Sequence, residues 1–116
     1  MVNVATMIGL IDQETRQAYA RDGAVVVRQA FDAEHVRWAT EAIDANLAAL
    51  SPRAKRASAD DDAPFIEDFC NWQRLPAMER FIRNSPAAQI AAELSNSDQI
   101  RLYHDHVLVQ EPGTRQ

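Results

Sequence analysis

The run of residues 99–110, with the sequence QIRLYHDHVLVQ, constrains the fold more than any other part of the chain. Apolar and polar side chains alternate through much of it, and β-branched and aromatic residues are frequent, so we expect one long β-strand. The Glu-Pro-Gly sequence at 111–113 then predicts a turn. A strand needs neighbours for its backbone N–H and C=O groups. Because little of the preceding sequence has strand character, we expect the chain to be the first part of a larger β-rich domain.

Composition indicates a globular protein of one domain and argues against some functions. The 116 residues are 47% hydrophobic and 25% charged, which is ordinary for a globular protein. The net charge of −5 argues against nucleic acid as a partner. The start of the chain has neither the basic region of a signal peptide nor the length of a membrane span, so we expect no membrane association. The single cysteine rules out an internal disulfide and favours a reducing, cytoplasmic location.

Helix-capping residues divide the first half of the chain. A helix is predicted between Asp12, which can accept hydrogen bonds from the first turn, and Gly23, which suits a left-handed helix end. The β-branched run at 24–28 predicts a buried strand. Asp32 is the expected cap of a helix over about 33–50, along which one apolar stripe is expected to be buried. The stripe consists of Val36, Ala39, Ile43, Leu47 and Leu50.

The second half begins with a connector and continues with two short helices. Residues 51–64 carry basic and acidic clusters but few apolar side chains, which predicts a mobile loop, with a lid over an active site as the alternative. Pro76 and Ser85-Pro86 predict the starts of the helices, and Asn96 the left-handed exit from the second. The side chains expected to fill the core are Phe65, Phe69, Trp72, Met78, Phe81, Ile82, Ile90 and Leu94.

Strand alternation defines the candidate site. On one long strand, a single face would carry Ile100, Leu102, His104, His106, Leu108 and Gln110. Histidines two positions apart on a strand can both reach one metal ion. With Glu111 they form the pattern His-x-His-x4-Glu, which resembles the first metal motif of cupins but lacks the glycine that normally precedes it. The alternative is that both histidines are hydrogen-bonded core or rim residues. Cys70 is expected to be a buried, small apolar residue rather than a nucleophile.

Several segments together resemble one enzyme family. They are YARDGAVVVR at 19–28, AFD at 30–32, WQR at 72–74, RFIRNSP at 80–86, IAAEL at 90–94 and RLYHDHVLVQEPG at 101–113. In order and spacing they resemble the phytanoyl-CoA dioxygenase family over about residues 15–114. Members of that family are non-haem Fe(II), 2-oxoglutarate-dependent oxygenases built on a double-stranded β-helix, a jelly roll flanked by helices. The resemblance implies that residues 1–116 form one partial α+β domain, a helical flank plus the first strands of a jelly roll.

The resemblance also sets expectations for cofactors. In the family, two histidines and a carboxylate hold Fe(II), and the first two ligands come from a His-x-Asp motif a few residues beyond a Glu-Pro-Gly turn. The sequence reaches Gln116 without that motif, and His104-Asp105-His106 has histidine where the carboxylate belongs. We therefore expect no catalytic and no metal-ligating residue in this chain, and neither Fe(II) nor 2-oxoglutarate bound to it alone.

The resemblance implies pocket residues near the end of the chain. Position 110 is often lysine in relatives, where it points into the barrel, so Gln110 becomes the candidate for 2-oxoglutarate binding, without the charge. His104, His106 and Leu108 become candidates for the wall of a substrate pocket. The alternative is that this face packs on the helices, because alternation alone does not identify the buried side.

Three functions follow from these observations. The first is the N-terminal part of an oxygenase that hydroxylates a small organic substrate and is inactive as this chain alone. The second is a non-catalytic protein-interaction module, or a degenerate remnant, that uses an open strand edge. The third is a cupin-like metal site at His104, His106 and Glu111. An unpaired strand at 99–110 further predicts self-association of the chain.

Overall fold

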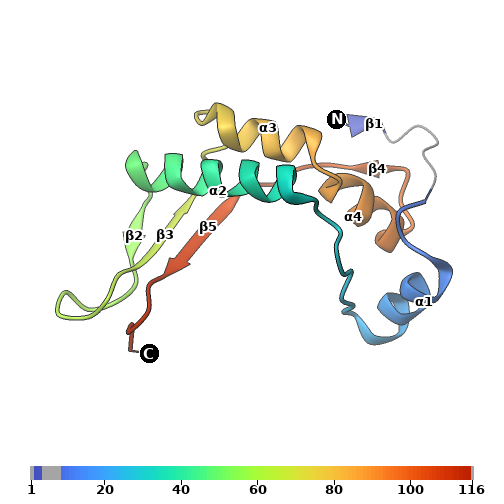
Figure 1. Cartoon of the computed structure of the whole chain (residues 1–116), viewed down its shortest axis with the longest axis horizontal. Coiled ribbons are helices and arrows are strands. Elements are labelled where there is room, and N and C mark those ends of the chain that lie inside the picture. Colours follow the sequence, from blue (N-terminus) through green and yellow to red (C-terminus); the bar gives the residue numbers. More distant parts are fainter. Residues whose placement is uncertain (1, 4–8, 116) are drawn as a thin grey trace.

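Four helices and two small antiparallel sheets make up the described part of the chain, residues 2–3 and 9–115 of a computed structural model (Figure 1). The helices are α1 (Gln13–Asp22), α2 (Ala33–Ala48), α3 (Pro76–Asn84) and α4 (Ala87–Ser95). The strands are β1 (Val2–Asn3), β2 (Lys55–Arg56), β3 (Phe65–Phe69), β4 (Gln99–Ile100) and β5 (His106–Gln110). The α+β class predicted from the sequence is confirmed.

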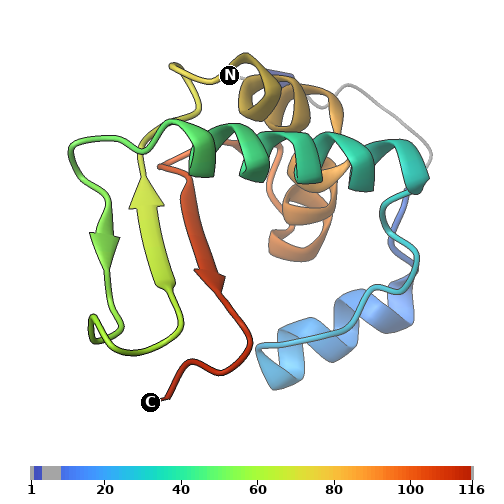
Figure 2. The same ribbon diagram turned by 60° about the vertical axis from the view of Figure 1, so that its left-hand side comes forward.

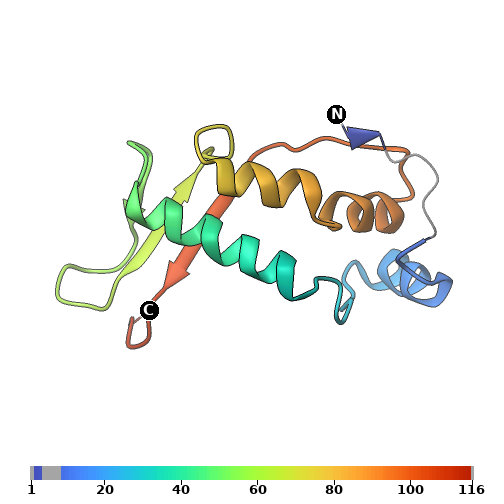
Figure 3. The ribbon, with the colours of Figure 1, turned by 45° about the horizontal axis from the view of Figure 1, so that its top comes forward.

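Helices α2 and α3 lie side by side across one face of the larger sheet (Figures 2 and 3). That sheet has the strand order β2-β3-β5, and β1 pairs with β4 in a separate ladder. The core contains Ala42, Leu75 and Met78, and Val107 of β5 packs against them. Helices α1 and α4 pack on each other at the opposite end of the molecule from the larger sheet (Figure 1). Within the described residues, the helices thus lie on one face of β3 and β5, at the end of the strands where Val107 packs, and leave the other face uncovered (Figure 2).

The helix ends follow the predicted capping residues, with one exception. The carboxylates of Asp12 and Asp32 accept backbone N–H groups of the first turn at 2.7 Å and 2.8 Å. Gly23 and Asn96 end α1 and α4 in the left-handed region, with φ of 74° and 49°. The exception is Ser85, which ends α3 and makes no side-chain cap on α4. The cap position of α4 falls on the proline that follows, so the hydroxyl stands one residue too early.

The predicted strand at 24–28 is wrong. These residues form no strand, although exposure still alternates along them, because Val25 and Val27 are half-buried and Val26 is 71% exposed. β-branched side chains favour strand geometry locally, but a strand forms only where a neighbour offers hydrogen bonds. No segment in the described part of the chain pairs with these residues. Their half-buried side faces α4 instead.

Helix α2 buries a different stripe from the predicted one. Val36 and Ile43 are 56% and 38% exposed, so the prediction that they are buried is wrong. The buried positions of the helix are Ala42 and Asn46. The small side chain of Ala42 allows close packing on the α3 residue Met78, and the amide of Asn46 reaches a carboxylate in the sheet. Apolar spacing alone does not reveal either contact.

The predicted long strand at 99–110 is divided into two. Its first two residues (β4) pair with β1, and only the last five (β5) join the larger sheet, antiparallel to β3. Residues 101–105 between them form no strand. The Asp105 carboxylate accepts the backbone N–H groups of Asn71 and Trp72 at 2.9 Å, which holds the chain against the turn after β3. The prediction that Ile100, Leu102 and His104 share one strand face with the residues of β5 is therefore wrong.

The connector at 51–64 contains β2, whose two residues pair with Glu67 and Ile66 of β3. Mobility of this loop, and a role as a lid, stay predictions. Cys70 is exposed and has φ of 61°, so the prediction that it is buried is wrong. Among the predicted core side chains, Met78 is buried and the others are half-buried. The helices of the described part lack the combination of length and apolar content that crossing a bilayer requires.

We expect two neighbouring positions of α2 to respond differently to substitution. Ile43→Ala should lower the free energy of unfolding by less than about 1 kcal/mol, because the side chain is partly exposed. Ala42→Leu should lower it by about 1–3 kcal/mol, because the added atoms overpack the contact with Leu75 and Met78. Urea unfolding followed by circular dichroism measures both. A larger loss for Ile43→Ala than for Ala42→Leu would contradict the orientation of the helix.

Candidate functional site on the open face of the sheet

The uncovered face of the larger sheet carries most of the predicted site residues. Residues opposite each other in an antiparallel ladder share a face. His106 lies opposite Phe69, Leu108 opposite Glu67, and Gln110 opposite Phe65, while β2 adds Lys55 beside Glu67. We call the following set the open face: Lys55, Phe65, Glu67, Phe69, His106, Leu108 and Gln110.

The open face points away from α2 and α3. Exposure alternates along β5, where the two valines are half-buried and the other residues are exposed. Val107 packs on the core, and Asp68 on the same side of β3 is buried against α2. The alternative in which this face of β5 packs on the helices is therefore wrong for His106, Leu108 and Gln110.

His106 makes the main polar and aromatic contacts of the open face. Its Nε2 lies 3.6 Å from Oε2 of Glu67, so the two form an ion pair when the imidazole is protonated. The Phe69 ring meets the imidazole edge-on, with 5.5 Å between ring centroids. The His104 ring lies 6.4 Å from that of His106, and Tyr103 contacts His104 at 4.9 Å. The face therefore combines aromatic contact area with one carboxylate–imidazole pair.

These side chains are not arranged as a set of three metal ligands in the described part of the chain. No group of three or more His, Cys, Asp or Glu side chains among residues 2–3 and 9–115 is placed to hold a metal ion, and this includes the predicted set of His104, His106 and Glu111. Asp105 lies between the histidines, but both of its carboxylate oxygens accept backbone N–H groups from the turn after β3. That carboxylate is used by the fold and does not complete a ligand set with the histidines.

Glu67 and Phe69 belong to the open face, although the sequence predicts a core position for Phe69, as it does for Phe65, and no role for Glu67. The signal that identifies them is the alternation of Phe65, Glu67 and Phe69 with residues of the other face, which is typical of a strand. Their meeting with His106 depends on the register between β3 and β5. That register joins distant parts of the chain and has no local signature.

The sheet is fixed from its helix side by a buried carboxylate. Asp68 is 1% exposed and accepts hydrogen bonds from the Asn46 amide at 2.8 Å and from the backbone N–H and hydroxyl of Ser51 at 2.8 Å and 2.6 Å. Asn71 donates to Asn46 and accepts from Arg74. Burial by itself raises the pKa of Asp68, but the hydrogen bonds from Ser51 and Asn46 together stabilise the anion more, so the pKa lies well below its ordinary value.

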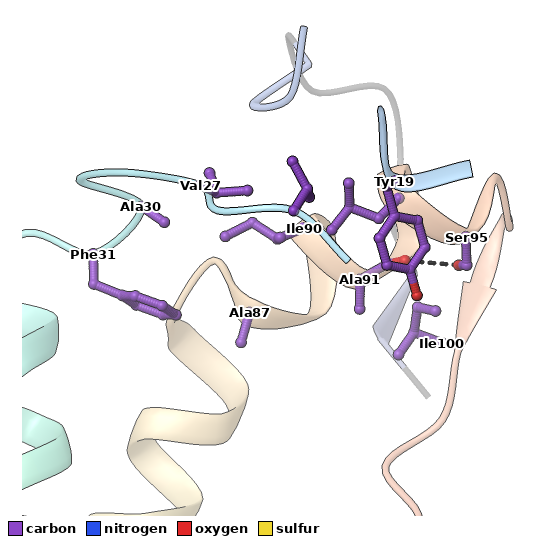
Figure 4. A pocket seen from close by; sticks show the side chains of 11 residues that line it. Tyr19, Val27, Ala30, Phe31, Ala87, Ile90, Ala91, Ser95 and Ile100 are labelled. Atoms are coloured by element: carbon purple, nitrogen blue, oxygen red, sulfur yellow. Dashed lines mark hydrogen bonds between the residues drawn. The ribbon is translucent and has the colours of Figure 1, made fainter. Parts of the chain in front are cut away.

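Away from the open face, a hollow lies between α1, α4 and the segment after α1 (Figure 4). It encloses about 560 Å³, and its walls are largely apolar, with Val25, Val27 and Ile90 among them. Tyr19 and Ser95 contribute hydroxyl groups, and that of Ser95 donates to a backbone carbonyl of its own helix at 2.7 Å. None of the predicted pocket residues lines it. One wall is the segment that lacks a strand partner, so the hollow marks a place where packing is incomplete.

Comparison of the chain with protein-family models, with curated proteins and with solved structures gives no match in any of the three. Within the described residues, the open face and the free edge of β5 are the features that bear on function.

We expect the pH dependence of stability to report the Asp68 carboxylate. Asp68→Asn should lower the free energy of unfolding by about 2–4 kcal/mol at pH 7, because the buried donors lose the anion that they surround. The folded pKa is depressed, so this stabilisation is present above the ordinary pKa of 3.8 and is lost as the pH falls toward the folded pKa.

The difference in unfolding free energy between the wild type and Asp68→Asn should thus shrink below about pH 4. Urea unfolding at pH 7 and at about pH 3 measures it. Asp44→Asn, at an exposed position of α2, is the matched control and should change little at either pH. A difference for Asp68→Asn that stays constant between the two pH values would show that the charge does not stabilise the fold.

The chain is expected to bind Fe(II) no more tightly than an ordinary protein surface does, because the described residues lack two histidines and a carboxylate that converge. Anaerobic titration calorimetry measures this. A stoichiometric site with Kd of about 1 μM or tighter would contradict it and favour the cupin-like site. His106→Ala, with His35→Ala on α2 as the control, would then show whether the open face holds the ion.

Proposed function

We propose that this chain forms the helical wall and the first strands of a non-haem Fe(II), 2-oxoglutarate-dependent oxygenase similar to the phytanoyl-CoA dioxygenase family, and that the complete enzyme hydroxylates a small organic substrate. The observation that carries the proposal is the orientation of β5. Helices lie on one of its faces, His106, Leu108 and Gln110 lie on the other, and its outer edge has no partner in the described chain. A jelly roll flanked by helices needs this arrangement, because its pocket lies among strands that continue the sheet.

The described residues differ in how well they suit the two expected cofactors, Fe(II) and 2-oxoglutarate. The described residues do not fit Fe(II), because Asp105 is held by backbone N–H groups and the histidines form no ligand set with Glu111. No step at the metal is therefore assigned to them. Gln110 fits a weaker role, since its exposed amide can donate a hydrogen bond to a carboxylate of 2-oxoglutarate without supplying the charge of a lysine. His106 and Leu108 fit the wall of a substrate pocket.

Two other features support a larger β-structure. The valine-rich segment at 24–28 has no strand partner in the described part of the chain, and Val26 is 71% exposed. Helix α2 exposes Val36 and Ile43 along one side. Apolar surface left in water costs free energy that burial would recover. The further strands of a jelly roll would supply a partner for the segment and cover for the helix.

The test begins with the reading frame beyond the codon for Gln116. We expect it to encode a His-x-Asp motif shortly after the Glu-Pro-Gly turn, and the longer protein to form succinate from 2-oxoglutarate in the presence of Fe(II). Succinate release with candidate small substrates measures this activity. A longer protein that contains no such motif, or that releases no succinate dependent on Fe(II), would contradict the proposal.

In the same protein, Gln110→Lys should lower the KM for 2-oxoglutarate by about 3–10-fold, because an ammonium group pairs with its carboxylate. Gln17→Lys adds the same charge at an exposed position of α1 and is the matched control. Equal effects of the two substitutions would remove Gln110 from the cofactor pocket without affecting the assignment of the reaction.

A second candidate function is a non-catalytic interaction module that adds a strand of a partner to its sheet. The unpartnered edge of β5 and the 55% exposure of Leu108 favour it. The reading frame separates the two candidates, because an interaction module requires no His-x-Asp motif and no succinate release.

A further inference from the structure

β5 is the last strand of its sheet, so one of its edges has no partner in the described part of the chain. At the two ends of the ladder, the backbone of Asp105 bonds to Cys70 at 3.0 Å and that of Glu111 bonds to Pro64 at 2.9 Å. Successive residues of a strand direct their N–H and C=O groups to opposite edges. The residues that direct them to the free edge are therefore His106, Leu108 and Gln110.

This edge lacks the usual protection against pairing. Edge strands are commonly shielded by charged side chains, by proline or by a bulge. The β5 sequence HVLVQ contains no proline and, with His106 neutral, no charge, and Leu108 at its centre is 55% exposed. The nearest charged residues along the sequence, Asp105 and Glu111, lie just outside the strand, and Glu67 beside the paired edge of β5 belongs to the neighbouring strand β3. The carboxylate of Asp105 is turned toward Asn71 and Trp72 of its own chain.

We propose that this edge binds β5 of a second copy of the chain, antiparallel and about a twofold axis at Leu108. Leu108 then faces Leu108 of the second copy, and His106 faces Gln110, whose amide can hydrogen-bond an imidazole. All five residues of each β5 enter the ladder, with about six backbone hydrogen bonds between the copies. Moving the axis by two residues would bring Pro112, which has no N–H, or the irregular segment 101–105 into the ladder.

The position of α2 favours an antiparallel second copy. The helix crosses β5 at the end where Val107 packs on the core, and it continues past the free edge of the strand (Figure 2). In an antiparallel pair, the N-terminal half of α2 lies over the opposite end of the second copy's β5, the end that carries Val109. The 56% exposed Val36 belongs to this half. A parallel pair would place both α2 helices at the same end of the strands, so neither helix would lie over the Val109 end of the other copy's β5.

The interface is small, so the dimer is weak. A pair of five-residue strands buries much less than the roughly 1,600 Å² of a typical stable interface, and we expect Kd of about 10 μM to 1 mM. The proposal does not rest on the oxygenase function, but the two compete for one edge: it concerns the edge as the described residues leave it, and a further strand of the same chain paired there would exclude the second copy.

Two measurements on the unmodified 116-residue chain test the proposal. In sedimentation equilibrium from about 10 μM to 1 mM, the mean mass should rise from 13.0 kDa toward twice that value. In amide hydrogen exchange by NMR, Val107 and Val109 should be protected at every concentration. His106, Leu108 and Gln110 should become protected only where the dimer forms. A constant mass of 13.0 kDa, or a dimer in which these three amides still exchange freely, would overturn the proposal.

Charge substitutions test the register. Leu108→Lys and Leu108→Glu should each remain monomeric over the whole concentration range, because two like charges would face each other across the axis. An equimolar mixture of the two should dimerise again, because the introduced charges are then opposite. Leu102→Lys, at a leucine that is 45% exposed but lies outside the ladder, is the control and should dimerise like the wild type. Loss of association in the control, or no recovery in the mixture, would overturn the register.

Discussion

The arrangement of helix and sheet depends on the buried carboxylate of Asp68. Neutral groups surround it, namely the amide of Asn46 and the backbone and hydroxyl of Ser51. A buried anion is tolerated only when such donors are in place, so the network joins α2, the loop that follows it and β3 at one point. This requirement sets the rotation of α2, because Asn46 must face the sheet. Ile43 lies about 100° round the helix from the buried Ala42 and is carried toward solvent as a consequence.

Predictions from local chemistry mostly succeed, with the Ser85 cap as an exception, and predictions that need a distant partner fail. Asp12, Asp32, Gly23 and Asn96 act within one helical turn, and each ends or starts a helix as its side chain or backbone preference requires. The run at 24–28 has the preference for a strand but no neighbour in the described chain, and pairing is a property of two segments. Asp105 divides the expected long strand through bonds to backbone groups up to 34 residues away, which no spacing along 99–110 reveals.

The candidate site is also only partly predictable from the sequence. A period of two places His106, Leu108 and Gln110 on one side of any strand that contains them, and this part of the prediction is confirmed. The side that faces solvent could not be derived from alternation alone; it follows from Val107 packing on the helices. Glu67 meets His106 only because β3 and β5 pair in one register, so the polar pair of the open face is a product of the tertiary structure.

The two faces of the larger sheet carry side chains with different roles. Both candidate functions of β5 involve its free edge. Asp68 and Asp105 use their oxygens to hold the fold, so neither carboxylate is left to serve a ligand on the open face. In His106, Leu108 and Gln110, the side chains point to the open face while the backbone groups point to the free edge. Whatever strand fills that edge therefore becomes the next wall beside these side chains. A second copy related by a twofold axis extends the sheet and leaves the face open, whereas several further strands of one chain can twist and close around it. The occupant of one strand edge thus decides whether the open face becomes an enclosed pocket.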